Sequence, residues 1–211
     1  MTNSFEIRIC ENPTCGLRYP LIKGHPFGER CPKCLGRTTP VITREIESEP
    51  PVPPIPSRII FEVLLDNIRS AWNVGAIFRT SDGFGVQKIY LCGITPTPEN
   101  PSVKKTALGA DTNIAWESFP NALDVIRKRK KEGRHIWALE QDHRAVSIHA
   151  RINLDPLPIL LIIGNEITGV DPGILDLCER IVEIPMLGKK RSLNVEVAFG
   201  VAMSALRSQL S

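Results

Sequence analysis

Apolar and polar positions along most of the chain alternate between two kinds of segment. Short apolar runs, of a length typical of buried strands, are separated by longer stretches that fit helices. The predicted strands are 59–65, 86–92, 135–139, 158–163 and 181–184. The predicted helices cover roughly 71–82, 119–132, 171–179 and 194–209. This alternation predicts an α/β fold, with a mostly parallel sheet and helices on both faces.

Polar clusters follow two of the predicted strands. The run from Ile159 ends in Gly164-Asn165-Glu166, and the run 59–65 leads into the segment 66–86, rich in Asn, Gly and Arg. Open α/β sheets bind ligands beyond the carboxyl ends of their strands, so these clusters are candidates for chemistry. Taken alone, Gly-Asn-Glu fits an ordinary strand-to-helix turn equally well.

The N-terminal region carries a separate pattern of cysteines. Four of the six cysteines form two close pairs, Cys10-x4-Cys15 and Cys31-x2-Cys34. Two such thiolate pairs are typical of a zinc ribbon, in which they surround one Zn²⁺ tetrahedrally. Disulfide pairing is the alternative, and it is rare in the cytosol. The sequence therefore predicts a structural zinc ion bound by all four cysteines.

A proline-rich segment divides the chain. Residues 50–56 contain five prolines in seven positions, which favours an extended spacer and excludes a helix. We therefore expect a zinc-ribbon-like module at 1–44, an acidic and proline-rich linker at 45–57, and the α/β domain at 58–211.

Composition and charge add two limits. The 211 residues carry a net charge of +3, which permits a nucleic-acid partner without demanding one. Among the basic clusters, Lys189-Lys190-Arg191 is the best candidate for RNA contact, since it flanks the polar segment 191–195. No apolar stretch reaches the roughly 18–20 residues that cross a bilayer, and no secretory signal is evident. We expect a cytoplasmic protein with no membrane partner.

The absence of one motif separates two classes of enzyme. A dinucleotide-binding enzyme of the doubly wound type needs Gly-x-Gly-x-x-Gly after its first strand. The first strand-to-helix turn carries Asn73-Val74-Gly75 instead. The sequence therefore disfavours a nucleotide-dependent enzyme of that type.

Three segments, 66–86, 159–166 and 191–195, resemble in order and spacing the three motifs of the SpoU/TrmH-like branch of the SPOUT RNA methyltransferases. The resemblance covers roughly Arg58 to Leu210. It implies a C-terminal trefoil knot, S-adenosylmethionine as methyl donor, a ribose 2′-hydroxyl of rRNA or tRNA as acceptor, and a homodimer. The alternative is a non-catalytic RNA-binding protein that retains the fold.

The resemblance also implies roles for particular residues. The implied cofactor-binding residues are Gly164, Ile184, Met186, Ser192 and Leu193. The implied catalytic residues are Arg79, Asn73, Glu166, Ser192 and Asn194.

Each catalytic assignment has a competing structural interpretation. A guanidinium has a pKa above 12, so we expect Arg79 to stabilise a developing alkoxide electrostatically rather than act as a base. Its alternative is a plain surface arginine. Asn73 fits a helix N-cap equally well, and Ser192 or Asn194 fits a cap of the last helix. Glu166 is expected to orient Arg79 or to bind RNA. The last helix is apolar on several sides, which predicts that a second subunit covers part of it.

Overall fold

The computed structural model describes residues 4–22, 24, 29–46, 60–152 and 158–209. The chain divides into two compact units, Met1–Pro54 and Ile55–Ser211. The proline-rich segment expected to link them, residues 50–56, lies outside the described residues.

The first unit is a small antiparallel sheet with the strand order β2-β1-β3. Its strands are β1 (Ser4–Cys10), β2 (Arg18–Ile22) and β3 (Thr38–Glu45). The four N-terminal cysteines lie at the end of β1 and in the turns that connect the strands. The cysteine spacing indicated a module here but not its strands.

The second unit is built on a seven-stranded sheet with the order β6-β5-β4-β9-β7-β10-β8. The strands are β4 (Phe61–Asp66), β5 (Lys88–Cys92), β6 (Ala115–Phe119), β7 (His135–Leu139), β8 (Val146–Ser147), β9 (Ile159–Ile163) and β10 (Arg180–Glu183). Every neighbouring pair is parallel, which confirms the predicted parallel sheet.

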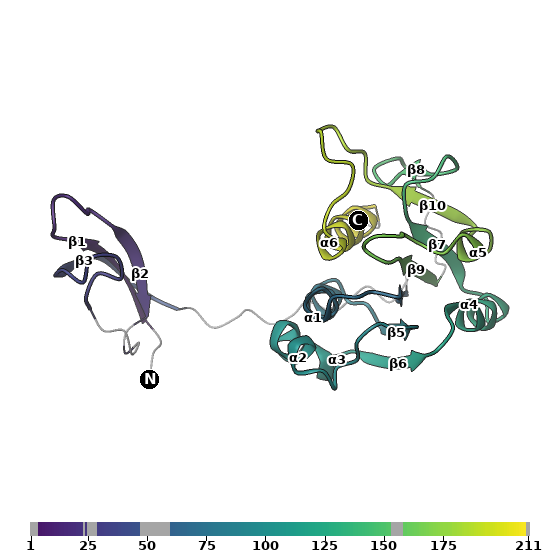
Figure 1. The fold of residues 1–211 in the computed structure, drawn as a ribbon, viewed down its shortest axis with the longest axis horizontal. Helices are drawn as coiled ribbons and strands as arrows, with labels where there is room; N and C mark the ends of the chain where they lie inside the picture. The colour runs from purple at the N-terminus through teal and green to yellow at the C-terminus, as the bar shows by residue number, and fades with distance from the viewer. Residues whose placement is uncertain (1–3, 23, 25–28, 47–59, 153–157, 210–211) are drawn as a thin grey trace. The chain divides into compact units, whose positions relative to one another are not determined.

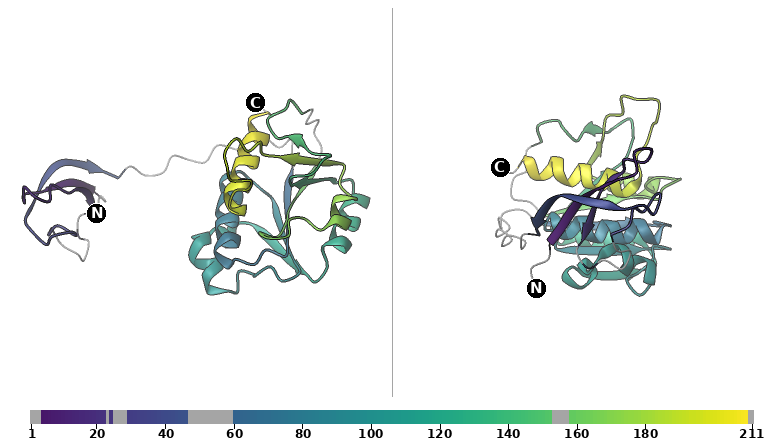
Figure 2. Two further views of the ribbon diagram at one scale, coloured as in Figure 1. Left: turned by 45° about the horizontal axis from the view of Figure 1, so that its top comes forward. Right: turned by 90° about the vertical axis from the view of Figure 1, so that its left-hand side faces the viewer.

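Helices cover both faces of this sheet. They are α1 (Ala71–Gly83), α2 (Pro101–Ala107), α3 (Ala110–Asn113), α4 (Ala122–Lys131), α5 (Pro172–Leu175) and α6 (Val195–Ser208). Figure 1 shows α1, α2, α3 and α6 on one face and α4 and α5 on the other, and Figure 2 shows the same division from a second direction.

Two apolar cores result from this arrangement. Phe61 packs with Phe78 and Phe199 on the face of α1 and α6. Leu64 packs with Ile126 on the face of α4. Alternate residues of β4 therefore point into different cores, as expected for a strand buried on both sides. Helices on both faces are confirmed; the trefoil knot stays a prediction.

Some element boundaries were predicted wrongly. The helix expected at 119–132 begins at Ala122, because Phe119 ends strand β6 and the side chain of Asn121 caps the helix by accepting from the Leu123 amide at 3.0 Å. The helix expected at 171–179 ends at Leu175, and the chain continues in tighter i+3 hydrogen bonds at Leu177 and Cys178. Strands β6 and β8 and helices α2 and α3 were not predicted.

Among the described residues, no helix combines the length and the apolar character that a membrane span requires.

Candidate functional site

The carboxyl edge of the parallel sheet holds a cavity of about 250 Å³. Strands β7, β9 and β10 all end there, because parallel strands bring their carboxyl ends to one edge. The cavity lining includes all five residues that the family resemblance assigned to the cofactor: Gly164, Ile184, Met186, Ser192 and Leu193. These residues follow two different strands, so the fold itself brings them together.

The lining of this cavity combines apolar surface with negative charge. Leu139 and Ile163 contribute apolar side chains. Glu140, Glu166 and Glu183 contribute carboxylates, whereas none of the lining residues is Lys, Arg or His. S-adenosylmethionine has a flat adenine ring whose faces pack against apolar side chains, a cationic sulfonium, and an amino acid end with an ammonium and a carboxylate group. The apolar side chains of the lining fit the ring, and its carboxylates fit the sulfonium and the ammonium group.

Two glycines allow the polar turn after β9 to close tightly. A Cβ at Gly164 would overlap the backbone of Gly169 and Val170. Gly169 has a φ of +71°, which favours glycine, and a Cβ there would overlap the carboxylate of Glu140. A side chain at either glycine would therefore change the shape of the cavity wall.

Asn165 fixes this turn from within and ties it to the neighbouring strand. Its Oδ1 accepts hydrogen bonds from the amides of Ile167 and Thr168, at 2.9 and 3.2 Å. Its Nδ2 donates to the carbonyl oxygen of Asn67 at 2.6 Å. Asn67 directly follows β4, so the turn is held against the start of the segment 66–86.

Glu166 binds the start of α1. Its two carboxylate oxygens accept hydrogen bonds from the amides of Arg69 (2.9 Å) and Ser70 (3.0 Å), and Oε1 also accepts from Asn73 Nδ2 (3.1 Å). Burial raises the pKa of this carboxyl, but these hydrogen bonds outweigh burial and hold the pKa below its ordinary value. Within one chain the carboxylate is engaged by the residues that precede α1 and by Asn73, so the expectation that Glu166 orients Arg79 stays a prediction.

Asn73 and Asn194 extend the same network to the third polar segment. Asn194 Nδ2 donates to Asn73 Oδ1 at 3.2 Å. Asn194 also caps α6, where its Oδ1 accepts from the Glu196 amide at 2.9 Å, so the predicted cap is confirmed. The N-cap of α1 is Ser70, whose hydroxyl accepts from the Asn73 amide at 3.3 Å. The interpretation of Asn73 as an N-cap is therefore wrong, and its side chain is free for the network.

Arg79 lies apart from this cavity. It is exposed on α1 and lines a second hollow of about 570 Å³. The first turn of α6 stands between the two spaces, since Val195 and Ala198 line the cofactor cavity whereas Glu196 lines the hollow. Within one chain, the structure thus connects Asn73, Glu166 and Asn194 by hydrogen bonds and places Ser192 in the cavity wall, but it does not bring Arg79 to them.

Three polar residues of this lining were not identified from the sequence. Glu140 and Gln141 directly follow β7, and Glu183 ends β10. Glu140 accepts from the Val170 amide at 2.9 Å, and the Gln141 side chain donates to the carbonyl of Arg191 in the third segment. The rule that ligands bind beyond the carboxyl ends of parallel strands could have identified all three.

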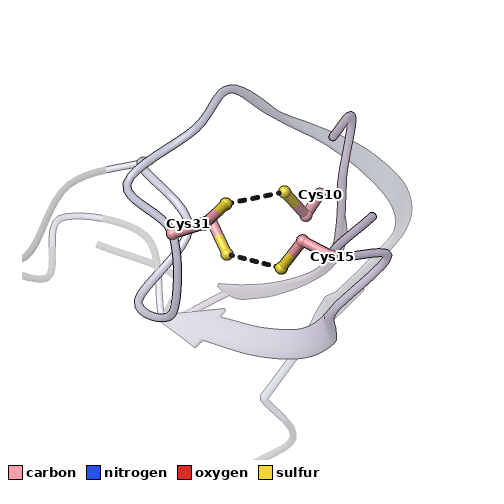
Figure 3. Close-up of side chains that lie close together, drawn as sticks. Cys10, Cys15 and Cys31 are labelled. Atoms are coloured by element: carbon pink, nitrogen blue, oxygen red, sulfur yellow. Dashed lines mark hydrogen bonds between the residues drawn. The ribbon is translucent and has the colours of Figure 1, made fainter. Parts of the chain in front are cut away.

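The four N-terminal cysteines form a second candidate site. Their sulfur atoms all lie within 4.8 Å of one another, with 3.4 Å between Cys10 and Cys34 and 3.8 Å between Cys15 and Cys31. Figure 3 shows Cys10, Cys15 and Cys31 directed toward a common centre. A tetrahedral zinc ion with Zn–S bonds of about 2.3 Å requires sulfur separations of about 3.8 Å, whereas a disulfide requires about 2.05 Å. The cluster fits zinc and does not fit the disulfide alternative.

The backbone around these cysteines fits the same interpretation. Gly16 and Leu35, each directly after a cysteine, have φ values of 54° and 60°. These left-handed residues turn the chain sharply, and the amide of Leu35 donates to the carbonyl of Cys31 at 2.8 Å. Each cysteine pair therefore lies in a tight turn, and such turns direct two thiolates toward the same metal ion.

The fold and this cavity define an α/β protein with a candidate ligand site at the carboxyl edge of a parallel sheet. Residues 60–204 match the SpoU rRNA Methylase family, and the chain belongs to this family. It is 31% identical over 147 residues to a 23S rRNA (guanosine-2′-O-)-methyltransferase of Neisseria meningitidis, a match that covers 70% of this chain and 58% of that protein.

Solved structures give the same result. The AdoMet-bound rRNA methyltransferase from Sinorhizobium meliloti matches 72% of this chain and 57% of its own, with a TM-score of 0.67 and 28% identity. The TrmH/SpoU tRNA modifying enzyme of A. aeolicus matches 73% of this chain and 76% of its own, with a TM-score of 0.63 and 27% identity. The chain spans less than two thirds of the length of the first curated relatives that it matches.

Proposed function

We propose that this chain is an S-adenosylmethionine-dependent RNA methyltransferase that acts on a ribose 2′-hydroxyl of rRNA or tRNA. The observation that carries the proposal is the carboxyl-edge cavity, whose lining holds Gly164, Ile184, Met186, Ser192 and Leu193. Family membership adds support, since similar proteins are named as rRNA 2′-O-methyltransferases and one solved relative holds AdoMet.

The proposed cofactor site uses the cavity as follows. The apolar side chains of Ile184, Met186 and Leu193 bind the adenine moiety, and the carboxylates of Glu140 and Glu183 attract the cationic end. The bound cofactor supplies an electrophilic methyl group on a sulfonium. The hydrogen bonds from Asn73 to Glu166 and from Asn194 to Asn73 hold the three polar segments together beside the cavity.

Arg79 is the proposed catalytic cation. The ribose hydroxyl is a poor nucleophile, and methyl transfer depends chiefly on its orientation and on stabilisation of the alkoxide that develops. The guanidinium of Arg79 is exposed and lies in a hollow large enough to receive part of an RNA chain. It would stabilise the negative charge that develops on the oxygen as the bond from the methyl carbon to sulfur breaks and the bond to oxygen forms. The sulfonium becomes a neutral thioether, and the hydroxyl proton passes to solvent water late in the transition state.

We further propose that the chain works as a homodimer. Val197, an apolar residue in the first turn of α6, is 45% exposed. A second copy packed on this face of α6 would bury it. The first turn of α6 borders both the cofactor cavity, through Val195, and the hollow of Arg79, through Glu196. We therefore propose that this packing also places Arg79 of one subunit beside the cofactor cavity of the other.

The N-terminal unit is proposed to be a zinc ribbon held by Cys10, Cys15, Cys31 and Cys34, with a structural role. A domain of this size has little apolar core, and metal binding supplies much of its folding free energy. The division into a ribbon at 1–44, a linker at 45–57 and a methyltransferase domain at 58–211 is part of the proposal. A cytoplasmic location stays a prediction.

Mapping of 2′-O-methyl groups in total RNA tests the proposed function. RNA from cells that lack this protein should lose methylation at one or a few ribose positions, and expression of the wild-type chain should restore it. A complete and unchanged set of 2′-O-methyl groups would instead favour the alternative, an RNA-binding protein that retains the fold without its activity.

A further inference from the structure

We propose that Trp72 is a base-stacking residue, on which an unpaired base of the RNA lies while Lys105 contacts the neighbouring phosphate. This inference rests on the proposed RNA methyltransferase function and names a contact that positions its substrate. Trp72 lies on α1, in the first polar segment, and 57% of its surface is exposed. An indole exposed to this extent is unusual, and it presents a face that every nucleobase can stack on.

A lysine from the neighbouring helix is held against this ring. Nζ of Lys105, on α2, lies 5.4 Å from the centroid of the Trp72 ring. The hydroxyl of Thr106 donates to the carbonyl oxygen of Trp72 at 3.2 Å, which ties the two helices together beside the pair. An aromatic face next to an exposed cation is the combination by which proteins bind single-stranded nucleic acid.

The crossing of α1 and α2 keeps this pair rigid. At Gly75, one turn after Trp72, the helices approach so closely that a Cβ would overlap Thr106 Oγ1 and the carbonyl of Val103. The backbone positions of Trp72 and Lys105 relative to each other are therefore fixed by packing between the helices. A preformed surface of this kind loses little conformational entropy when a base stacks on it.

Trp72 also has a defined position relative to Arg79. The two residues are seven positions apart on α1, so they lie on the same face of the helix, about 10 Å apart along its axis at 1.5 Å per residue. Ala76, on the stripe between them, lines the same hollow as Arg79 and Lys105. A base on Trp72 would thus belong to a nucleotide near the one whose ribose meets Arg79.

The charge of this surface favours RNA over a second protein chain. Arg79 and Lys105 both line the hollow, and Lys104 is exposed next to Lys105, whereas Glu196 is the single carboxylate in the hollow's lining. Neither Arg79 nor Lys105 forms an ion pair within the part of the chain that the structure describes. A polyanion would neutralise the two lysines, Lys104 and Lys105, whereas two copies of the chain that met through these lysines would repel each other.

The test measures binding of a single-stranded oligouridylate to the full chain at low salt, for the wild type and for Trp72→Ala, Trp72→Phe and Leu108→Ala. Trp72→Ala should weaken binding about 5- to 150-fold, the range found when one stacked base loses its aromatic partner. Trp72→Phe should retain most of the affinity. Leu108 is the matched control, since it is 66% exposed and lines the hollow of Arg79 and Lys105 but has no aromatic face. Leu108→Ala should change binding little.

Two results would overturn the inference. One is wild-type affinity in Trp72→Ala. The other is a shift of both Trp72→Ala and Leu108→Ala from dimer to monomer in sedimentation, which would make this surface a contact between copies of the chain.

Methyl transfer by the same variants separates this inference from the proposed function. If both hold, Trp72→Ala should raise the KM for RNA and leave kcat nearly unchanged. Absence of methyl transfer in the wild type, with RNA binding still dependent on Trp72, would refute the proposed function alone. If the wild type transfers methyl groups normally but Trp72→Ala binds RNA as tightly as the wild type does, the stacking role alone would be refuted.

Discussion

Asn194 Nδ2 donates a hydrogen bond to Asn73 Oδ1 at 3.2 Å, although 121 positions separate the two residues. Asn73 in turn donates to Glu166 at 3.1 Å. One residue from each of the three polar segments therefore takes part in a single network. Because Asn194 caps α6 and Glu166 binds the residues before α1, the network fixes the starts of both helices beside the cavity.

Replacement of Glu166 by Gln should weaken this network. A neutral amide accepts hydrogen bonds from the amides of Arg69 and Ser70 less strongly than a carboxylate does, and its NH₂ group would face donors. We expect the free energy of unfolding to fall by about 1 kcal/mol at pH 7, as for loss of a helix cap. Thermal or denaturant unfolding would measure this change, with the exposed Glu99→Gln as the control.

The effect of Glu166→Gln should also depend on pH. The folded-state pKa of Glu166 lies below its ordinary value of 4.5, so the ionised carboxylate stabilises the fold. This contribution is fully present above about pH 4.5 and is lost as the pH falls through the lowered pKa. The difference between wild type and variant should therefore shrink in acid, and an equal difference at pH 7 and in acid would contradict the assignment.

Substitution of Gly164 should damage the cofactor site. A valine there would overlap the backbone of Gly169 and Val170 and push the turn into a new position. Overpacking of this kind costs about 1–3 kcal/mol. Because the cost falls on the conformation that binds the cofactor, S-adenosylmethionine should bind about 5- to 150-fold more weakly in calorimetry. Gly83→Ala is the matched control, because a Cβ at Gly83 meets nothing within 4 Å. Equal cofactor affinity in Gly164→Val and Gly83→Ala would argue against this cavity as the site.

The cysteine cluster predicts a metal content. Freshly purified protein should carry about one zinc ion per chain, measurable by elemental analysis. Cys31→Ser should lose the zinc and unfold the N-terminal unit while the α/β unit stays folded, as amide signals of the two units would reveal. Cys178→Ser is the control, since Cys178 lies outside the cluster. Purified, unchelated protein without stoichiometric metal would contradict the ribbon.

Elements of the fold that are fully buried were predicted well from the sequence, and elements that are partly exposed or short were not. Strands such as β9, with every residue buried, appear as continuous apolar runs and were predicted nearly to their ends. Edge strand β6 was missed because several of its residues are exposed, which removes the apolar signal. Helices α2 and α3 are short, and their few buried positions are too sparse for a periodic pattern.

The candidate site was harder to derive from first principles. Its polar segments belong to loops far apart in the sequence, and the order of the strands decides which loops meet. Family resemblance supplied Asn73 and Asn194 as site residues, but it supplied neither their hydrogen bond nor the separation of Arg79 from the cavity. Trp72 was missed for a similar reason: its exposure depends on how α1 and α2 pack, and the sequence pattern carries no sign of it.

The most direct test of the account is a comparison of wild type and Arg79→Ala in RNA methylation at saturating RNA, with labelled S-adenosylmethionine and analysis of the digested nucleosides. The wild type should produce a 2′-O-methylated nucleoside. Arg79→Ala should lower the rate about 10²- to 10³-fold, the usual cost of removing one group that stabilises a developing oxyanion. Cofactor binding should change little, because Arg79 does not line the cavity of its own chain and is proposed to act on the ribose hydroxyl of the RNA. Arg79→Lys should restore little activity, because a point charge lacks the planar fork of the guanidinium. Label on a base, or near-normal turnover by Arg79→Ala, would contradict the account.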